Sequence, residues 1–470
     1  MTEEFEYTGK WRLPDNPDKK VHGTLKITPG EGAVLDLIGS FVPLPDSLPN
    51  SDFFRNSHTI FGFSSNGKKL SLFNCFLTQL PLHFPGFPVS SFFVDTVLVG
   101  AYFQKIEDVK LKSISVYYSH LDEWVGISGF ELGNLNQYTS RKELVVKYKK
   151  PRSIETNING LKIKIGNDFS FKTLSAPLKE IIMKERAFIA IEPSESKFFE
   201  EYTTDILYHI RNFLSLGVME PVYPLTIVGS TEEDVDVGGD RDSKVEIFSD
   251  LRNIPKTIKE LHPFDMLFTY VDISDRFEVL LKNWFEKASL LEPIYDLYFG
   301  TLYNPHLYLE FQFLSLIQAI ESLHRRVYGG AYMPKEDYSE IYENLFTAIP
   351  ESLDNDHKES LKSRLKYGYE FSLRKRLREL LNKYKENFKD FVDITNNNTF
   401  ISKVVDTRNY LTHHDKELKE RAVEGEELYT ITQKLKILLE ICLLTELGFT
   451  SEEIRNLFSK NRRYKNEFIQ

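Results

Sequence analysis

Cysteine is almost absent from this sequence of 470 residues, which contains only Cys75 and Cys442. Two cysteines so far apart can form neither a disulfide framework nor a cysteine-rich zinc site. Long apolar runs are absent too, since no stretch of about 18 consecutive apolar residues occurs, and we expect no helix that spans a membrane. The opening residues are acidic and polar, whereas a secretory signal peptide is basic and then apolar. These absences predict a cytoplasmic protein without a membrane partner.

Positive charge is in short supply in the N-terminal part of the chain. The formal net charge is −10, and residues 301–470 hold 26 Lys and Arg against 27 Asp and Glu, so nearly all of the acidic excess lies in residues 1–300. This excess argues against RNA as the main ligand of the N-terminal part. The C-terminal part carries basic clusters at 374–378 and 462–463. Such clusters either follow a phosphate backbone or form the solvated face of a helix.

The sequence is rich in side chains that can build a core, with 41% hydrophobic and 13% aromatic residues. This composition is typical of ordinary globular proteins and argues against disorder. A chain of this length is too long for a single core, so we expect two or three domains.

Residues 1–190 contain short runs of β-branched and aromatic residues, bounded by Pro, Gly, Asn and Asp, which is typical of strands. The predicted strands are 21–27, 33–38, 59–63, 70–76, 92–99, 114–118, 144–148 and 161–165. Their spacing favours an antiparallel sandwich or barrel. One helix is predicted after them, over 198–214, from its apolar residues at helical spacing.

The C-terminal part changes to helical periodicity. Helices are predicted over 307–327, 338–348, 353–367, 373–388, 400–411 and 424–448. Their apolar stripes would be buried against one another in a bundle. The predicted fold class is therefore α+β: a β-rich, sandwich- or barrel-like domain with added helices over 1–300, then an all-α bundle over 301–470.

The segment 406–415, DTRNYLTHHD, is the sharpest local feature of the sequence. It ends an apolar helix with Arg408, Asn409 and two histidines, His413 and His414, which no packing argument requires. We expect these residues at a transition from helix to loop, a position that gives access to a substrate.

The spacing of Arg408 and His413 resembles the R-x4–6-H motif of HEPN domains, and residues 311–323 resemble their first long helix. The N-terminal half resembles the N-terminal domain of ApeA-like anti-phage proteins, through GKWRLP at 9–14 and VHGTLKI at 21–27. Together the resemblances cover nearly the whole chain. They imply an RNA endonuclease that uses no metal and no cofactor, acts as a dimer and shuts down an infected cell. They also imply that residues 1–300 sense a phage product, with a phage protein as one candidate trigger.

The residues of the motif suit this chemistry, because RNA carries its own nucleophile in the ribose 2′-OH. His413 can transfer protons near neutral pH, which typically contributes a factor of about 10²–10⁴. Arg408 offers a planar, permanently charged fork for phosphate oxygens, and Asn409 is a neutral donor that orients phosphate or His413. The expected partner is RNA, with transfer RNA as one candidate.

Helix geometry limits how this site can be built. On a straight helix Asn409 and His413 share a face, whereas Arg408 and His413 lie about 140° apart. Both can reach one phosphate only if the helix ends before His413 or if a second protomer completes the site. The second condition predicts a two-fold homodimer.

Three accessory residues and two alternative functions stay open. His414 also satisfies the motif and could replace His413, Glu321 could hold Arg408 from the upstream helix or lie in solvent, and Asp406 is a plausible neighbour. One alternative is a metal-dependent HD-type phosphohydrolase that uses His414 and Asp415, which would need further ligands on other helices. The other is a non-catalytic bundle that only dimerises or binds RNA, with Arg408 in an ordinary buried salt bridge to Asp406 or Glu321.

Overall fold

The computed structural model describes residues 4–41, 53, 55–79, 88–133, 145–173, 177, 179–231, 244–388 and 397–468. Two compact units make up the chain: Met1–Val218 with Val222–Glu278, and Met219–Pro221 with Val279–Gln470. The first is rich in strands and the second is helical, which confirms the predicted α+β class. The division falls within helix α5 (Phe277–Glu286), upstream of residue 301, where the sequence suggests a boundary.

The N-terminal unit is organised around one large antiparallel sheet. Its strands in chain order are β1 (Phe5–Leu13), β2 (Asn16–Thr28), β3 (Gly32–Ile38), β4 (His58–Ser64), β5 (Lys69–Gln79), β6 (Val89–Val99), β7 (Lys110–Tyr118), β10 (Ile154–Ile158), β11 (Leu161–Thr173), β12 (Ile181–Pro193), β13 (Lys197–Phe198), β14 (Pro224–Thr231) and β15 (Lys244–Phe248). The sheet order is β10-β11-β12-β7-β14-β15-β6-β3-β2-β1-β4-β5, and β13 pairs with β7. Because β5 also pairs with β6, the last six strands close into a barrel.

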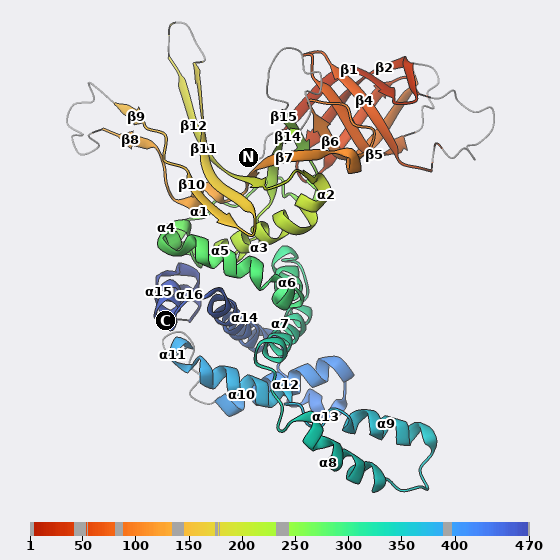
Figure 1. Ribbon diagram of the computed structural model, residues 1–470, viewed down its shortest axis with the longest axis vertical. Helices are drawn as coiled ribbons and strands as arrows, with labels where there is room; N and C mark the ends of the chain where they lie inside the picture. Colours follow the sequence, from red (N-terminus) through yellow and green to blue (C-terminus); the bar gives the residue numbers. More distant parts are fainter. Residues whose placement is uncertain are drawn as a thin grey trace. The chain divides into compact units, whose positions relative to one another are not determined.

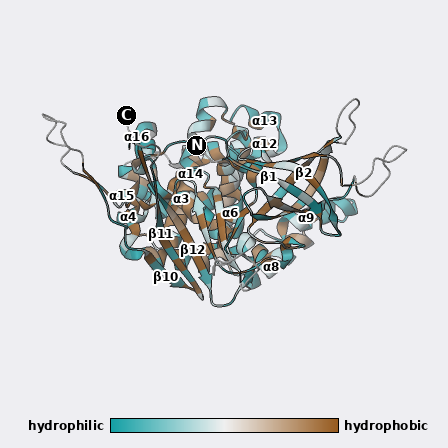
Figure 2. Ribbon diagram, turned by 90° about the horizontal axis from the view of Figure 1, so that it is seen from above, coloured by the Kyte–Doolittle hydropathy of each residue, from teal (hydrophilic) through white to brown (hydrophobic). Residues whose placement is uncertain are grey.

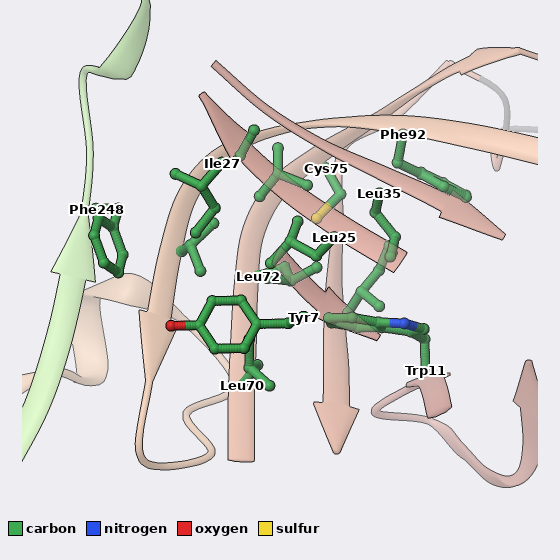
Figure 3. Close-up of a cluster of buried hydrophobic side chains, with 14 of the residues drawn as sticks. Tyr7, Trp11, Leu25, Ile27, Leu35, Leu70, Leu72, Cys75, Phe92 and Phe248 are labelled. Atoms are coloured by element: carbon green, nitrogen blue, oxygen red, sulfur yellow. The ribbon is translucent and has the colours of Figure 1, made fainter. Parts of the chain in front are cut away.

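The barrel interior is filled by alternating apolar residues from its six strands (Figure 3). Trp11 is fully buried, and its indole Nε1 donates a hydrogen bond to the Gly23 carbonyl at 3.0 Å. A Cβ at Gly62 would lie 2.2 Å from the Trp11 ring, so only glycine leaves room for the indole. Tyr7 points its ring into the same core, and burial, with the nearby Glu246 charge, raises its pKa to about 12. This core confirms the barrel-like prediction.

Two hairpins project from the other end of this sheet (Figure 1). The outer part of β11 pairs only with β12, and together they form a long two-stranded arm in which brown and teal residues intermingle in Figure 2. A separate two-stranded sheet is formed by β8 (Phe130–Leu132) and β9 (Val146–Tyr148). The predicted strand 144–148 corresponds to β9, and residue 144 lies outside the described residues.

Short helices pack against the sheet of the N-terminal unit. They are α1 (Leu121–Val125), α2 (Phe199–Glu201), α3 (Leu207–Val218) and α4 (Tyr270–Ile273), and a π-helical turn, Tyr202–Ile206, joins α2 to α3. The buried Trp124 meets Phe213 edge-on, with ring centroids 6.2 Å apart, and lies in the same aromatic cluster as Phe277. The predicted helix 198–214 is therefore present, although a π turn interrupts it after α2 and it ends later than expected.

The C-terminal unit is a helical bundle. After α5 its helices are α6 (Ala288–Tyr303), α7 (Leu309–Leu323), α8 (Lys335–Thr347), α9 (Asn355–Leu365), α10 (Leu373–Lys383), α11 (Lys385–Phe388), α12 (Asn397–His413), α13 (Lys416–Lys419), α14 (Gly425–Leu447), α15 (Ser451–Lys460) and α16 (Arg462–Phe468). All six predicted helices are present. The predicted helix 373–388 is divided into α10 and α11, and a π-helical turn, His324–Tyr328, extends α7.

Helix α14 forms the centre of this bundle, since it packs against α7 and α15 and is buried on most sides. Its Glu440 is a fully buried carboxylate. The Tyr298 hydroxyl donates to Glu440 Oε1 at 2.6 Å, and the Tyr464 hydroxyl donates to the other oxygen. This buried group is thus hydrogen-bonded on both oxygens, as burial of a charge requires. In the described part of the chain, no helix has both the length and the apolar character to cross a bilayer.

Candidate active site

Helix α12 carries the candidate catalytic residues and is fixed in the bundle by one buried face. Ile401, Val404 and Thr407 recur every third residue and are fully buried, while α12 packs against α10 and α7. Arg408 and Asn409 follow on the flank of this face and are half-buried. These two polar residues therefore lie next to the buried face of α12.

Among the described residues, the Arg408 guanidinium contacts an amide and no carboxylate. Its Nη1 donates a hydrogen bond to Asn409 Oδ1 at 3.2 Å. Among the residues that the structure describes, no ion pair joins Arg408 to Asp406 or Glu321, which is what the non-catalytic alternative would require. A guanidinium has five donors, so most of them are left for an anionic substrate.

The two histidines lie at the C-terminal end of α12, and both are exposed. His413 is the last residue of the helix, whereas His414 has a left-handed backbone with φ of 52° and stops it. The His414 N–H donates to the Tyr410 carbonyl at 2.6 Å, and its ring meets the Tyr410 ring edge-on at 5.5 Å. Asp415 then caps α13 by accepting from the Glu417 N–H. His413 is therefore the less engaged of the two rings.

The helix continues through His413, so the expectation that it ends before this residue is wrong. The helix extends two residues beyond Leu411, because the helical hydrogen bonds continue as far as the one from the His414 N–H to the Tyr410 carbonyl. In one chain Arg408 and His413 are thus about 140° apart around the helix axis, while Asn409 and His413 share a face. The structure brings Arg408 and Asn409 together and leaves His413 on another side of α12.

In the described part of the chain, the accessory residues Glu321, Asp406 and His414 do not gather around Arg408. Glu321, on α7, forms an ion pair with Arg325 at 3.5 Å, one turn further along the chain. Asp406 is half-buried on α12. His414 packs on Tyr410, as described above. None of these contacts connects the accessory residues to the guanidinium of Arg408 within the described part of the chain.

Sequence reasoning did not identify a buried polar network between α10, which packs against α12, and the π turn that follows α7. Arg376 and His324 are each about 1% exposed, and Arg376 Nη1 donates to His324 Nδ1 at 3.0 Å. His324 Nε2 lies 3.2 Å from Glu379 Oε2. The neighbouring Arg374 reaches α12, where its Nη1 donates to Ser402 Oγ at 2.7 Å. The basic cluster 374–378 is therefore partly a structural element, and neither a phosphate track nor a solvated face describes Arg376.

Burial lowers the pKa of His324, and the Arg376 charge lowers that pKa further. A neutral imidazole is also what the contacts require, since Nδ1 must accept from the guanidinium. The only signal in the sequence was His324 itself, near the end of an apolar helix. A lone histidine at such a position gives no indication of its partner on another helix.

A cavity of about 410 Å³ lies in the N-terminal unit. It is lined by Asn74, Asp95, Thr96, Ile106, Glu107, Phe199, Glu200, Thr203, Ser249 and Asp250. Four carboxylates around one cavity repel a phosphate backbone, which agrees with the acidic balance of residues 1–300.

Among the residues that the structure describes, potential metal ligands are not gathered around the two histidines. In the described ranges no group of three or more His, Cys, Asp or Glu side chains could hold a metal ion. The HD-type alternative needs such a group around His414 and Asp415. Instead, His414 meets the Tyr410 ring edge-on and Asp415 caps α13.

Comparison with protein families gives two matches. Residues 6–284 match the family model described as ApeA N-terminal domain 1, and residues 314–453 match the one described as Apea-like HEPN. The second match includes all of α12, with Arg408, Asn409 and His413. Searches of the curated proteins and of the solved structures found no match.

Proposed function

The chain belongs to the ApeA family, with an ApeA N-terminal domain 1 followed by an Apea-like HEPN domain, and on this premise we propose that it is an anti-phage RNA endonuclease. The N-terminal unit recognises a phage product, and the helical unit cuts RNA. Cleavage shuts down the infected cell, as an abortive-infection mechanism requires.

The observation that carries this proposal is that Arg408 has no carboxylate partner among the described residues. A half-buried guanidinium ordinarily finds a carboxylate, and this one donates to Asn409 Oδ1 instead. Its charge is thus left for a ligand, one turn away from an exposed imidazole at the end of the same helix. Both groups suit a phosphodiester: the guanidinium binds its oxygens, and the imidazole transfers protons near neutral pH.

The reaction needs no external nucleophile. His413 takes the proton of a ribose 2′-OH, whose oxygen attacks the adjacent phosphorus, and the bond from phosphorus to the 5′-oxygen breaks. A protonated imidazole gives its proton to the departing 5′-oxygen. Arg408 and Asn409 stabilise the charge that builds on the non-bridging oxygens. The products are a 2′,3′-cyclic phosphate and a 5′-hydroxyl, and the proton taken from the 2′-OH ends on the 5′-oxygen.

Two copies of the chain are required for this arrangement. Arg408 and His413 lie about 140° apart on a helix that runs through both, so one chain cannot direct both at the same phosphate. A two-fold axis beside α12 brings His413 of each copy toward Arg408 of the other, so the dimer holds two sites, each with one guanidinium and one imidazole that acts first as base and then as acid.

Exposed aromatic residues at one end of the bundle support a dimer interface beside α12. Helices α7 and α14 pack together, and the Tyr328 hydroxyl, just beyond α7, donates to Glu446 near the end of α14, so both helices begin at the same end. There, Tyr308, Phe311 and Tyr429 are exposed. Apolar side chains of this size on a surface are typical of a protein interface.

Helix α12 reaches the same end of the bundle. The Val423 N–H, just before α14, donates to Thr407 Oγ1 at 3.0 Å, and Lys403 pairs with Glu427 in the first turn of α14. Arg408 therefore lies close to the aromatic end of the bundle. A second copy that covers Tyr308 and Tyr429 would also approach the catalytic residues.

Cleavage of total cellular RNA tests the proposal. Relative to the wild type, we expect His413→Ala to lose a factor of about 10²–10⁴ in cleavage rate. His414→Ala is the matched control and should keep most of the activity, because its ring packs on Tyr410. Circular dichroism shows whether both variants fold, and end analysis of the fragments should find cyclic phosphates.

Other outcomes point to the alternatives. Equal cleavage by wild type and His413→Ala, with loss in His414→Ala, would move the catalytic role to His414. No cleavage of any RNA by the wild type would favour a bundle that only dimerises or binds RNA. Loss of activity in EDTA would favour the HD-type phosphohydrolase, because its chemistry needs a metal.

A further inference from the structure

The β8–β9 and β11–β12 hairpins turn their apolar faces toward each other at their bases. In β8–β9, Phe130 pairs with Tyr148, so both side chains lie on one face. The Tyr148 ring stacks on Phe169 of β11, with centroids 4.0 Å apart and planes within 14°. Phe130 completes this aromatic cluster at the base of the two hairpins.

A single carboxylate fixes the two hairpins together. Glu185, on β12, accepts hydrogen bonds at one oxygen from Ser128 Oγ and the Gly129 N–H, both at 2.9 Å. Its other oxygen accepts from the Tyr148 hydroxyl at 3.2 Å and from Asn167 Nδ2 at 3.1 Å. With four donors from three segments, the angle between the hairpins is set by the fold.

Beyond this base, apolar side chains of both hairpins are exposed. Leu132 and Val146 pair on β8–β9, while Phe171 and Ile181 lie further out on the same face of the arm as Phe169. Leu132 is 54% exposed and Phe171 is 52% exposed. We call these five residues, Leu132, Val146, Phe169, Phe171 and Ile181, the hairpin face. A group of exposed apolar side chains of this kind is typical of an interaction site.

The strand edges beside the hairpin face are also free. In the described ranges β11 pairs with β10 only over residues 161–165, and β12 pairs with β7 only over residues 189–191. The β8–β9 pair forms a sheet of its own. The Ala187 N–H of β12 donates to Asp122 Oδ1 at 2.6 Å. Further out along β12 and along β11, the described strands leave the outer edge open to an added strand, which proteins normally prevent unless the edge is used.

The charge around the hairpin face is basic, although the chain as a whole is acidic. Lys147, Lys149, Lys150, Lys172 and Lys184 are all exposed on or directly beside the two hairpins. Of the acids on these strands, Glu185 holds the hairpins together and Asp168 accepts from the Tyr117 hydroxyl, while Glu131 on β8 is exposed and is outnumbered by the lysines. The surface therefore attracts a negatively charged partner.

We propose that the hairpin face is a docking surface for an acidic, apolar segment of another protein, bound in extended conformation along the free strand edges. Alternate residues of such a strand would cover the hairpin face, and its carboxylates would meet the flanking lysines. RNA fits less well, because Leu132, Val146 and Ile181 cannot stack on bases and Phe169 already stacks on Tyr148. The proposal does not depend on the nuclease mechanism.

Peptide binding to the full-length protein tests this proposal. The probe is a fluorescein-labelled peptide of about 12 residues that alternates valine or phenylalanine with aspartate, long enough to span one strand edge. The comparison probes are the same peptide with lysine for aspartate and an oligouridine RNA. Fluorescence anisotropy should show the acidic peptide binding at least about tenfold more tightly than either, with affinity that falls as salt is added.

Variants locate the binding site. Phe171→Ser combined with Ile181→Ser should weaken binding of the acidic peptide about tenfold or more. Ile38→Ser, which changes an exposed apolar residue on barrel strand β3, is the matched control and should bind as the wild type does. The proposal is wrong if the acidic peptide does not bind, if the double variant binds it unchanged, or if oligouridine binds more tightly and the double variant loses it.

Discussion

Protonation of His324 is unfavourable in the folded helical unit, because this residue is buried and hydrogen-bonded to Arg376. Arg376 donates to Nδ1 of His324, so this nitrogen must carry a lone pair, and the proton of the neutral ring is on Nε2, facing Glu379. Protonation at Nδ1 would place two cationic donors against each other in a buried site. The pKa of His324 is lowered accordingly, first by burial and then by the Arg376 charge.

This pKa predicts how stability changes with pH. Because the folded-state pKa of His324 is below the unfolded value of about 6.5, its contribution to stability is complete above that value and is lost as pH falls toward the folded pKa. The free energy of unfolding from urea titrations should therefore decrease below neutral pH. His324→Gln should remove part of this decrease, whereas His413→Ala, at an exposed position, should retain it. An unchanged pH dependence in His324→Gln would contradict the assignment.

At the same scale, the two kinds of polar residue differ in what the sequence could reveal. Arg408, Asn409 and His413 could be singled out because they end an apolar helix where no core requires them. Arg376 could not, because it lies in a run of basic residues, and its partner His324 is 52 residues away in the sequence. Burial of a charged residue depends on contacts between helices, which local patterns do not contain.

The helices and strands themselves could be predicted where their periodicity was clean. The predicted barrel strands over residues 21–99 are all present, because alternating apolar residues mark them. Strand β12 was missed, since the charged residues of MKER interrupt its apolar pattern around position 184. The end of α12 was placed at Leu411, two residues early, because neither glycine nor proline marks the stop and a left-handed His414 makes it instead. Barrel closure rests on pairing of β5 with β6 and β1 with β4, which only the folded chain shows.

One hydrogen bond joins α12 to the segment that leads into α14, and its loss should be measurable. Thr407 Oγ1 accepts from the buried Val423 N–H at 3.0 Å. Thr407→Val keeps the shape but leaves this N–H without an acceptor, which should cost about 1–3 kcal/mol in the free energy of unfolding. Thr430→Val, whose hydroxyl is exposed on α14, is the control and should change stability by less than about 0.5 kcal/mol. Equal stability of the two variants in urea unfolding would show that the contact contributes nothing.

For the whole molecule, the position of Arg408 and His413 on different sides of α12 makes the proposed site a property of two chains. If each site takes Arg408 from one copy and His413 from the other, Arg408→Ala and His413→Ala are each inactive as pure dimers. A mixed dimer of the two variants contains one site with both residues intact and one with neither. Random exchange makes half of the dimers mixed, so the mixture should recover about a quarter of wild-type RNA cleavage.

The recovered RNA cleavage must come from exchange of subunits between dimers, and the controls test this. Mixing followed by mild denaturation and refolding should restore activity, and chemical crosslinking of each variant before mixing should prevent it. A mixture of Arg408→Ala with the double variant Arg408→Ala/His413→Ala should stay inactive, because no chain in it carries an arginine at 408. If the first mixture also stays inactive while sedimentation shows mixed dimers, each chain builds its site alone. The guanidinium and imidazole would then have to meet within one α12, and that requires the last turn of this helix to unwind when RNA binds.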